Sequence, residues 1–297
     1  MKQIRLLWFS GFAFLLIISS LFYCKQKTSP NETEIQRIEK IVFLYTNDRH
    51  FDLNLQPEFA GMINQYKSQY DDVFLVDAGD VFVKNANCWS INGGMLLDTV
   101  WYGMRAMEMI EQMNKLGYNL LTLGNHELAY IGDYTQNALR TSQFPLLAAN
   151  ISINTDKLPE PEPYAFLTTS NNHKIAVLGL STDNTKREGI MELNLDSVVN
   201  SYLWLKDSSD VFIALTHIGL KNDEVLAKKF PEFDAIIGGH SHDLLLEPVY
   251  VNSVIIVQAG GSPHSVSDEH KVYLGELILT LECGKITQKS SRVIEIK

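Results

Sequence analysis

The amino-acid sequence predicts a layered α/β fold. Two observations support this prediction: short apolar runs with little alternation recur along the chain, and helical patterns lie between them. Runs that are apolar throughout are typical of strands buried on both faces, and strands that alternate with helices favour an α/β architecture. The length of 297 residues, of which 45% are hydrophobic and 20% charged, allows one large domain or two small ones.

The expected strands are short, and the second half of the chain is richer in them. They cover residues 41–45, 73–76, 119–123, 146–149, 175–180, 211–215, 235–237, 254–257 and 272–281. Residues 58–70 and 101–116 are expected to be helices, and Gly117 ends the second of them. We interpret as core packing the face of this second helix whose residues recur at helical spacing, namely Tyr102, Ala106, Met109, Met113 and Leu116.

The N-terminal residues are expected to direct export rather than to fold. Lys2 and Arg5 precede a nearly uncharged apolar stretch, residues 6–23, which is typical of an export signal. The stretch is near the minimum length of a transmembrane helix, so an uncleaved membrane anchor is the alternative. Residues 21–24 resemble a bacterial lipobox, in which Cys24 would be acylated. We therefore expect an exported, membrane-attached lipoprotein in the periplasm or on the cell surface.

These features divide the chain into an export signal (residues 1–23), a polar tether (residues 24–38) and one folded domain (residues 39–297). The formal charge of −10 argues against binding of a nucleic-acid polymer through charge. The two remaining cysteines, Cys88 and Cys283, could form one disulfide in an oxidising compartment or both be free.

Polar clusters rich in histidine follow several of the expected strands. Four of them hold five of the eight histidines of the chain, and a fifth has an aspartate in the same setting. If the fold brings these strand ends together, their oxygens and nitrogens form the donor set that a pair of divalent cations requires. The clusters are Asp48-Arg49-His50, Gly79-Asp80, Gly124-Asn125-His126-Glu127, Thr216-His217 and Gly239-His240-Ser241-His242.

Local spacing adds to this expectation. Asp48 and His50 are two residues apart, and side chains at this spacing in extended backbone point to the same side. His240 and His242 have the same spacing, and the glycine before Asp80 lets the backbone turn sharply and present a carboxylate that can bridge two cations. A single member of the set is more commonly a structural residue, but the ordered combination is hard to obtain by chance.

In this order, the clusters resemble those of the calcineurin-like metallophosphoesterase family, and more narrowly the catalytic domain of bacterial 5′-nucleotidases. The similarity spans about residues 40–282 and is carried by residues 45–50, 76–80, 124–127, 148–151, 236–242 and 257–260. It implies a four-layer fold in which two β-sheets are sandwiched between helices. It also implies two divalent metal ions at the strand ends, and the mixed oxygen and nitrogen donors suit zinc, manganese, iron or cobalt.

The resemblance further implies a role for each side chain. One metal ion would be held by Asp48, His50, Asp80 and His242. The other would be held by Asp80, Asn125, His217 and His240. His126 would not bind metal but would assist the leaving group, while a metal-bridging hydroxide attacks phosphorus. The substrate that the resemblance favours is a small phosphomonoester, most simply a 5′-nucleotide.

The chain departs from the nucleotidase pattern in two places. Where those enzymes carry an aspartate that orients the catalytic histidine, this chain has Ala129, with Tyr130 and Asp133 as nearby substitutes. Those enzymes also have a C-terminal domain that contacts the nucleoside, whereas this sequence stops at Lys297. We therefore expect such contacts from a partner or from residues 83–94, or else a substrate that is not a nucleotide.

Several alternatives follow from these departures. Hydrolysis of a phosphodiester, a cyclic nucleotide or a sulfur ester would use the same site, and the thiosulfate-cleaving branch of the family also lacks this aspartate. A non-catalytic surface lipoprotein that keeps the metal site for binding is the alternative from a different class. The complete set of ligand residues argues against it, since a decaying site is expected to lose ligands first.

Overall fold

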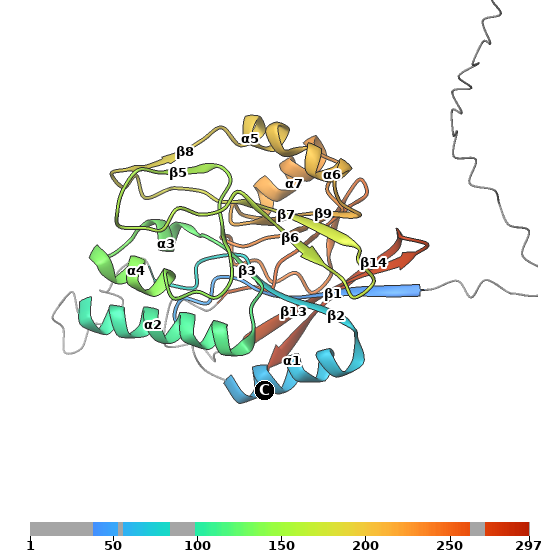
Figure 1. Ribbon diagram of the computed structural model, residues 1–297, viewed down its shortest axis with the longest axis horizontal. Coiled ribbons are helices and arrows are strands. Elements are labelled where there is room, and N and C mark those ends of the chain that lie inside the picture. Colours follow the sequence, from blue (N-terminus) through green and yellow to red (C-terminus); the bar gives the residue numbers. More distant parts are fainter. Residues whose placement is uncertain (1–37, 53–55, 84–98, 262–270, 297) are drawn as a thin grey trace, which may run out of the picture. The chain divides into compact units, whose positions relative to one another are not determined.

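Two six-stranded sheets organise the part of the chain that the computed structural model describes, residues 38–52, 56–83, 99–261 and 271–296 (Figure 1). From edge to edge, the first sheet contains β14 (Lys285–Ile296), β13 (Val272–Glu282), β1 (Ile38–Thr46), β2 (Asp72–Asp77), β3 (Leu120–Thr122) and β4 (Leu146–Leu147). The second contains β11 (Val249–Val251), β12 (Val254–Val257), β10 (Ala235–Ile237), β9 (Val211–Thr216), β7 (Lys174–Leu180) and β6 (Tyr164–Thr168). A separate ribbon pairs β5 (Ile151–Ile153) with β8 (Ile190–Glu192).

Helices cover the outer faces of both sheets. On the first sheet lie α1 (Gln56–Gln69) and α2 (Thr99–Leu116), with α4 (Gly132–Leu139) packed beside α2 (Figure 1). The second sheet is covered by α5 (Leu195–Tyr202), α6 (Trp204–Asp207) and α7 (Leu220–Lys229). The short helix α3 (Asn125–Leu128) follows β3 directly.

Three apolar cores separate these elements into four layers. Val42 and Leu44 of β1 belong to the core shared with α1 and α2, whereas Phe43 between them belongs to the core between the two sheets. In β9, Ile213 faces that central core and Phe212 faces the core under α5, α6 and α7. Both strands are therefore buried on both faces, as their uniformly apolar sequences indicate. The predicted four-layer α/β fold is confirmed.

Parallel pairing determines where the functional residues gather. In the first sheet, β1, β2 and β3 are parallel neighbours, and in the second sheet β7, β9, β10 and β12 are parallel neighbours. The carboxyl ends of parallel strands meet at one edge of a sheet, where ligands of α/β proteins commonly bind. The polar clusters of the sequence follow the carboxyl ends of β1, β2, β3, β9 and β10.

Several predictions made from the sequence fall on residues outside the described part of the chain. These are the export signal, the acylated Cys24, nearly the whole tether, Cys88, and all but the first of residues 83–94, from which substrate contacts are expected. They stay predictions.

Cys283 is described: it lies exposed in the turn between β13 and β14 with a free thiol. Within the described ranges, no helix combines the length and the apolar character needed to cross a bilayer.

Candidate metal centre

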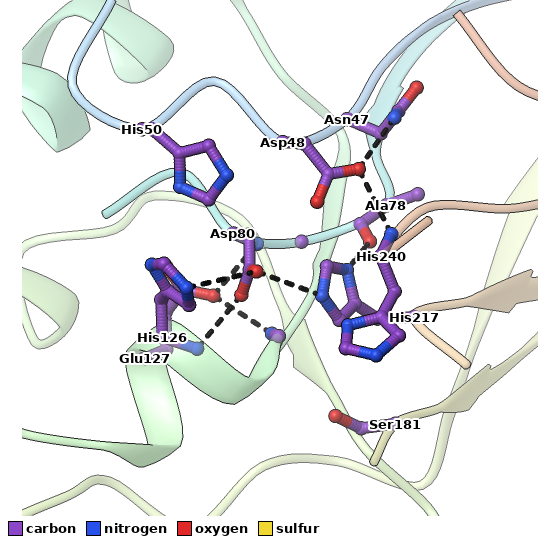
Figure 2. A network of polar contacts seen from close by, with 12 residues as sticks. Asn47, Asp48, His50, Ala78, Asp80, His126, Glu127, Ser181, His217 and His240 are labelled. Atoms are coloured by element: carbon purple, nitrogen blue, oxygen red, sulfur yellow. Dashed lines mark hydrogen bonds and ion pairs between the residues drawn. The ribbon is translucent and has the colours of Figure 1, made fainter. Parts of the chain in front are cut away.

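The predicted ligand residues converge at the carboxyl edge of the two sheets (Figure 2). Donor atoms fall into three groups, and within each group they lie within 4.8 Å of one another. The first sheet supplies Asp48 and His50 after β1 and Asp80 after β2, and Asn125 opens α3. The second sheet supplies the remaining imidazoles. The groups are Asp48–His50–His242, His50–Asp80–His126 and Asp80–His217–His240.

Three buried atoms of this cluster have no hydrogen bond of acceptable geometry. They are Asp48 Oδ1, Asn125 Oδ1 and His217 Nε2, although Asp80 Oδ2 lies 3.1 Å from the last of these. A buried polar atom without a partner costs about 1–3 kcal/mol, so such atoms require an explanation. Cations bound among these residues would satisfy all three atoms. The residues present therefore fit a metal centre.

The surroundings of Asp48 leave one of its oxygens available. Asp48 Oδ2 accepts hydrogen bonds from Asn47 Nδ2 at 2.6 Å and from the backbone N–H of His240 at 2.9 Å. The other oxygen, Oδ1, lies 3.3 Å from His242 Nε2. His242 Nε2 in turn lies 3.1 Å from His50 Nε2, so two imidazole nitrogens and one carboxylate oxygen converge. This is the donor set that zinc and its neighbours in the first transition row prefer.

Backbone carbonyls fix the rings of two histidines. His217 Nδ1 donates to Ala78 O at 2.7 Å, and His50 Nδ1 donates to Phe82 O at 2.9 Å. Because a carbonyl oxygen can only accept, the proton of each neutral ring lies on Nδ1 and the Nε2 lone pair faces the cluster. Metal-binding histidines commonly have such a partner behind the ring.

Burial and neighbouring charges set the protonation states of the cluster. Burial lowers the pKa of His50 to about 3 and raises that of Asp48 to about 6. Burial opposes the charge of Asp80, but His217 holds the pKa of the Asp80 carboxyl well below its usual range. For His217, burial alone would lower the pKa, yet Asp80 raises it to about 10. A proton and a cation compete for Nε2 of His217, so metal binding there releases a proton.

His126 lies at the edge of the same cluster. Its backbone N–H donates to Asp80 Oδ1 at 2.8 Å, and its Nε2 lies 3.7 Å from Asp80 Oδ2 (Figure 2). Its Nδ1 donates to Phe82 O at 3.2 Å. Asp133 instead binds Lys157 at 2.6 Å, and the hydroxyl of Tyr130 donates to Glu188 O at 3.5 Å. The Phe82 carbonyl, rather than Tyr130 or Asp133, thus contacts the His126 ring.

The backbone of the ligand loops differs from the expectation. The predicted i, i+2 pairs assumed extended backbone, and this was wrong. The four residues of these pairs, and Asp80 as well, lie just past strand ends at φ angles between 46° and 80°, the left-handed region that residues with a Cβ rarely adopt. Such conformations cost about 1–3 kcal/mol each and are concentrated at functional sites. They are Asp48, His50, Asp80, His240 and His242.

Glu127 has a structural role that the sequence did not reveal. Its buried carboxylate accepts backbone N–H groups from Asp80 at 3.0 Å, Phe82 at 2.8 Å and Gly124 at 2.8 Å. Burial raises the pKa of this carboxyl to about 8. Glu127 thereby fastens the loop after β2 to the start of α3, which carries Asn125 and His126. A glutamate three residues after a helix cap is the signal that could have indicated this role.

The chain belongs to the calcineurin-like phosphoesterase family. The model of this family matches residues 41–244, which include every residue of the cluster. The fold and the convergence of Asp and His donors at the strand ends agree with that membership.

The chain is also similar to individual proteins and solved structures within this class. The chain is 28% identical to the trifunctional nucleotide phosphoesterase YfkN of Bacillus subtilis over 74% of this chain and 17% of that protein. It is 29% identical to a 5′-nucleotidase of Vibrio cholerae over 83% of this chain and 47% of that protein. Among solved structures, a 5′-nucleotidase precursor from Thermus thermophilus superposes with a TM-score of 0.70 at 20% identity, covering 86% of this chain and 54% of that one. The chain thus spans about half the length, or less, of these relatives.

Proposed function

We propose that this chain hydrolyses a phosphate ester with the help of two divalent metal ions. The observation that carries the proposal is that three of the five buried side-chain atoms without a hydrogen-bond partner in the described part of the chain belong to expected ligands, namely Asp48 Oδ1, Asn125 Oδ1 and His217 Nε2. Asp48, His50, Asp80 and His242 would hold one ion. Asp80, Asn125, His217 and His240 would hold the other. Zinc, manganese, iron and cobalt all suit this donor set.

The bound ions would supply a water of lowered pKa and would neutralise the charge of the substrate phosphate. The chain's own residues do the rest. Asp80 lies between His126 and His217 and joins the two halves of the donor set (Figure 2). His126 presents Nε2 to the site while Phe82 O holds its Nδ1. With both nitrogens protonated, Nε2 donates its proton to the departing oxygen, and such assistance is typically worth ~10²–10⁴ in rate.

A phosphomonoester such as a 5′-nucleotide is the substrate that we propose. The relatives named as 5′-nucleotidases support this choice, as does the nucleotide phosphoesterase from Bacillus subtilis. A second candidate follows from Ala129, because the absence of the family aspartate there favours a leaving group that needs less acid assistance. Sulfur esters are such substrates, and phosphodiesters and cyclic nucleotides are further candidates for the same site.

A substrate panel tests the proposal. The full chain, purified in detergent, is assayed with AMP, p-nitrophenyl phosphate, bis(p-nitrophenyl) phosphate and a sulfur ester, each with and without a chelator. We expect chelator-sensitive release of phosphate from AMP, and metal analysis of the same sample to give two ions per chain. Hydrolysis of the diester or the sulfur ester alone would select the second candidate. The absence of chelator-sensitive hydrolysis of any substrate would support the alternative of a non-catalytic metal-binding protein.

We further propose that the chain is exported and acylated at Cys24. The apolar stretch of residues 6–23 followed by a polar segment supports this location. Cells fed with a labelled fatty acid should incorporate the label into the wild-type chain and not into Cys24→Ser. Equal labelling of both chains, or none in either, would contradict acylation at this residue.

A further inference from the structure

Asp223 is a fully buried acid that the proposed mechanism does not use. It lies in the first turn of α7, and its carboxylate reaches the ends of three neighbouring strands of the second sheet. In β10, Ile237 pairs with Leu215 of β9 on one side and with Val257 of β12 on the other. The next residue of each strand or strand end, Thr216, Gly238 and Gln258, therefore lies in one row across the sheet.

The carboxylate of Asp223 accepts hydrogen bonds from the two outer residues of this row. Thr216 Oγ1 donates to Asp223 Oδ1 at 2.7 Å, and Gln258 Nε2 donates to Asp223 Oδ2 at 3.2 Å. Gly238 lies between the two donors, and a Cβ at that position would overlap the carboxylate. A glycine at the centre of the row is thus required for the acid to enter.

Gln258 extends these contacts to the loop that carries two of the expected ligands. Its Oε1 accepts from Ser241 Oγ at 3.2 Å, and Ser241 Oγ accepts from the backbone N–H of Leu220 at 3.0 Å. Leu220 is the first residue of α7, so the hydrogen bonds form a ring that starts and ends on this helix. Ser241 separates His240 from His242, and Thr216 directly precedes His217.

We propose that Asp223, Gln258 and Ser241 are positioning residues that hold His217, His240 and His242 ready for metal binding. This inference rests on the metal centre of the proposed function. The network binds residues of the two loops that carry all the ligands of the second sheet. Partners behind metal ligands typically change metal affinity ~10–100-fold when they are removed.

A network that only stabilised the fold would behave differently. Its loss would lower the unfolding temperature of the metal-free chain and leave the affinity of the folded chain for metal unchanged. A positioning network lowers the metal affinity of folded protein. The two roles are therefore separated by measuring zinc affinity by chelator competition and thermal unfolding of the metal-free protein on the same variants.

A charge exchange makes the test specific. In Gln258→Glu, a carboxylate replaces the donor that faces Asp223, so two carboxylates oppose each other. Adding Asp223→Asn restores every hydrogen bond. The new amide group at position 223 donates to the glutamate at position 258, while its oxygen still accepts from Thr216. That glutamate still accepts from Ser241. We expect zinc affinity to fall ~10–100-fold in Gln258→Glu and to return to the wild-type value in the double variant.

Two further variants complete the test. Ser241→Ala removes one link at an exposed position, so it should fold normally and bind zinc more weakly than wild type. Asp234→Asn is the matched control, because Asp234 bonds Phe212 N and Lys206 at the opposite end of the same strands. Its zinc affinity should equal that of wild type.

The outcomes distinguish this inference from the proposed function. Wild-type zinc affinity in both Gln258→Glu and Ser241→Ala would overturn the positioning network and leave the metal centre intact. Failure of the double variant to recover would also overturn it. A wild-type chain that bound zinc tightly but hydrolysed no ester would remove the proposed function and leave the network standing.

Discussion

His126 and Asp80 touch the same cluster but are expected to contribute in different ways. Asp80 is buried and belongs to two of the three groups of donor atoms, whereas the His126 side chain is 16% exposed and its Nδ1 is held by a backbone carbonyl. The His126 ring is thus partly open to solvent, whereas the Asp80 carboxylate is not. These differences favour metal binding for Asp80 and proton donation for His126.

Replacement of His126 by alanine should separate the two roles. We expect the turnover number to fall ~10²–10⁴-fold, because a positioned acid contributes about that much. Metal content should equal that of wild type, since the other donor residues are untouched. Asp80→Ala is the comparison variant and should lose metal as well as activity. Loss of metal in His126→Ala, to the extent seen in Asp80→Ala, would show that His126 is a ligand.

For single residues, the sequence predicted the metal-binding donors well but did not predict the residues that hold them in place. The donor clusters were found because Asp, Asn and His have distinctive chemistry and directly follow apolar strands. The roles of Glu127 and Asp223 were not found, because they depend on partners 45 and 35 residues away in Phe82 and Gln258. Left-handed backbone at the ligands was missed for a similar reason: the surrounding fold, rather than the local sequence, imposes it.

Among the individual elements, the end of β2 joins neighbouring strands through a buried acid. Asp77 Oδ2 accepts from Thr46 Oγ1 of β1 at 2.6 Å, and Oδ1 accepts from the N–H of Gly79 at 2.8 Å. Thr46 also bonds the hydroxyl of Tyr118, just before β3, at 2.7 Å. Burial raises the pKa of Asp77 from its ordinary 3.8 to about 7. The carboxyl ends of β1 and β2 thus share one polar network with Tyr118 at the start of β3.

This pKa predicts a pH dependence of stability. Because the folded-state pKa lies above the unfolded one, the folded state holds the proton more tightly between about pH 4 and pH 7. The contribution of Asp77 is fully present below that window and is lost as the pH rises through it. Asp77→Asn carries no such proton and can donate to Thr46. Urea unfolding should therefore show a smaller decline in stability for the variant, and equal declines would contradict the assignment.

Strand position explains which elements the sequence predicted. All nine expected strands and both expected helices are present, and most are central or long. Five strands were missed. Of these, β6, β11 and β14 lie at sheet edges, where exposure to solvent admits polar residues and interrupts the apolar run, and β5 and β8 form the separate ribbon. The missed helices α3 to α7 have ten residues or fewer, too short to establish a clear helical period.

Across the whole domain, the expected ligands come from both sheets. The first sheet provides Asp48, His50, Asp80 and Asn125, and the second provides His217, His240 and His242. The central core packs the sheets face to face through residues such as Phe43 and Ile213. Bound metal ions would add a polar link between the sheets at one edge of this apolar contact.

Metal removal should therefore weaken the domain as a whole. A ligand present at 100 times its dissociation constant stabilises the folded state by about 2.7 kcal/mol. We expect a chelator to lower the free energy of unfolding by this order and to increase amide exchange at the carboxyl ends of strands from both sheets. Calorimetry and hydrogen exchange measure the two effects. An unfolding temperature that does not respond to chelator, in protein shown to contain metal, would contradict this expectation.

The positive φ angles at the donor residues have a consequence for protein engineering. Because the loop backbone determines where these side chains point, the loops must be transferred together with the ligands. If the seven side chains alone were placed on straight strand ends of another scaffold, their donor atoms would no longer converge. Libraries that vary these positions should favour glycine, asparagine and aspartate, which tolerate the required torsion, and omit valine, isoleucine and threonine.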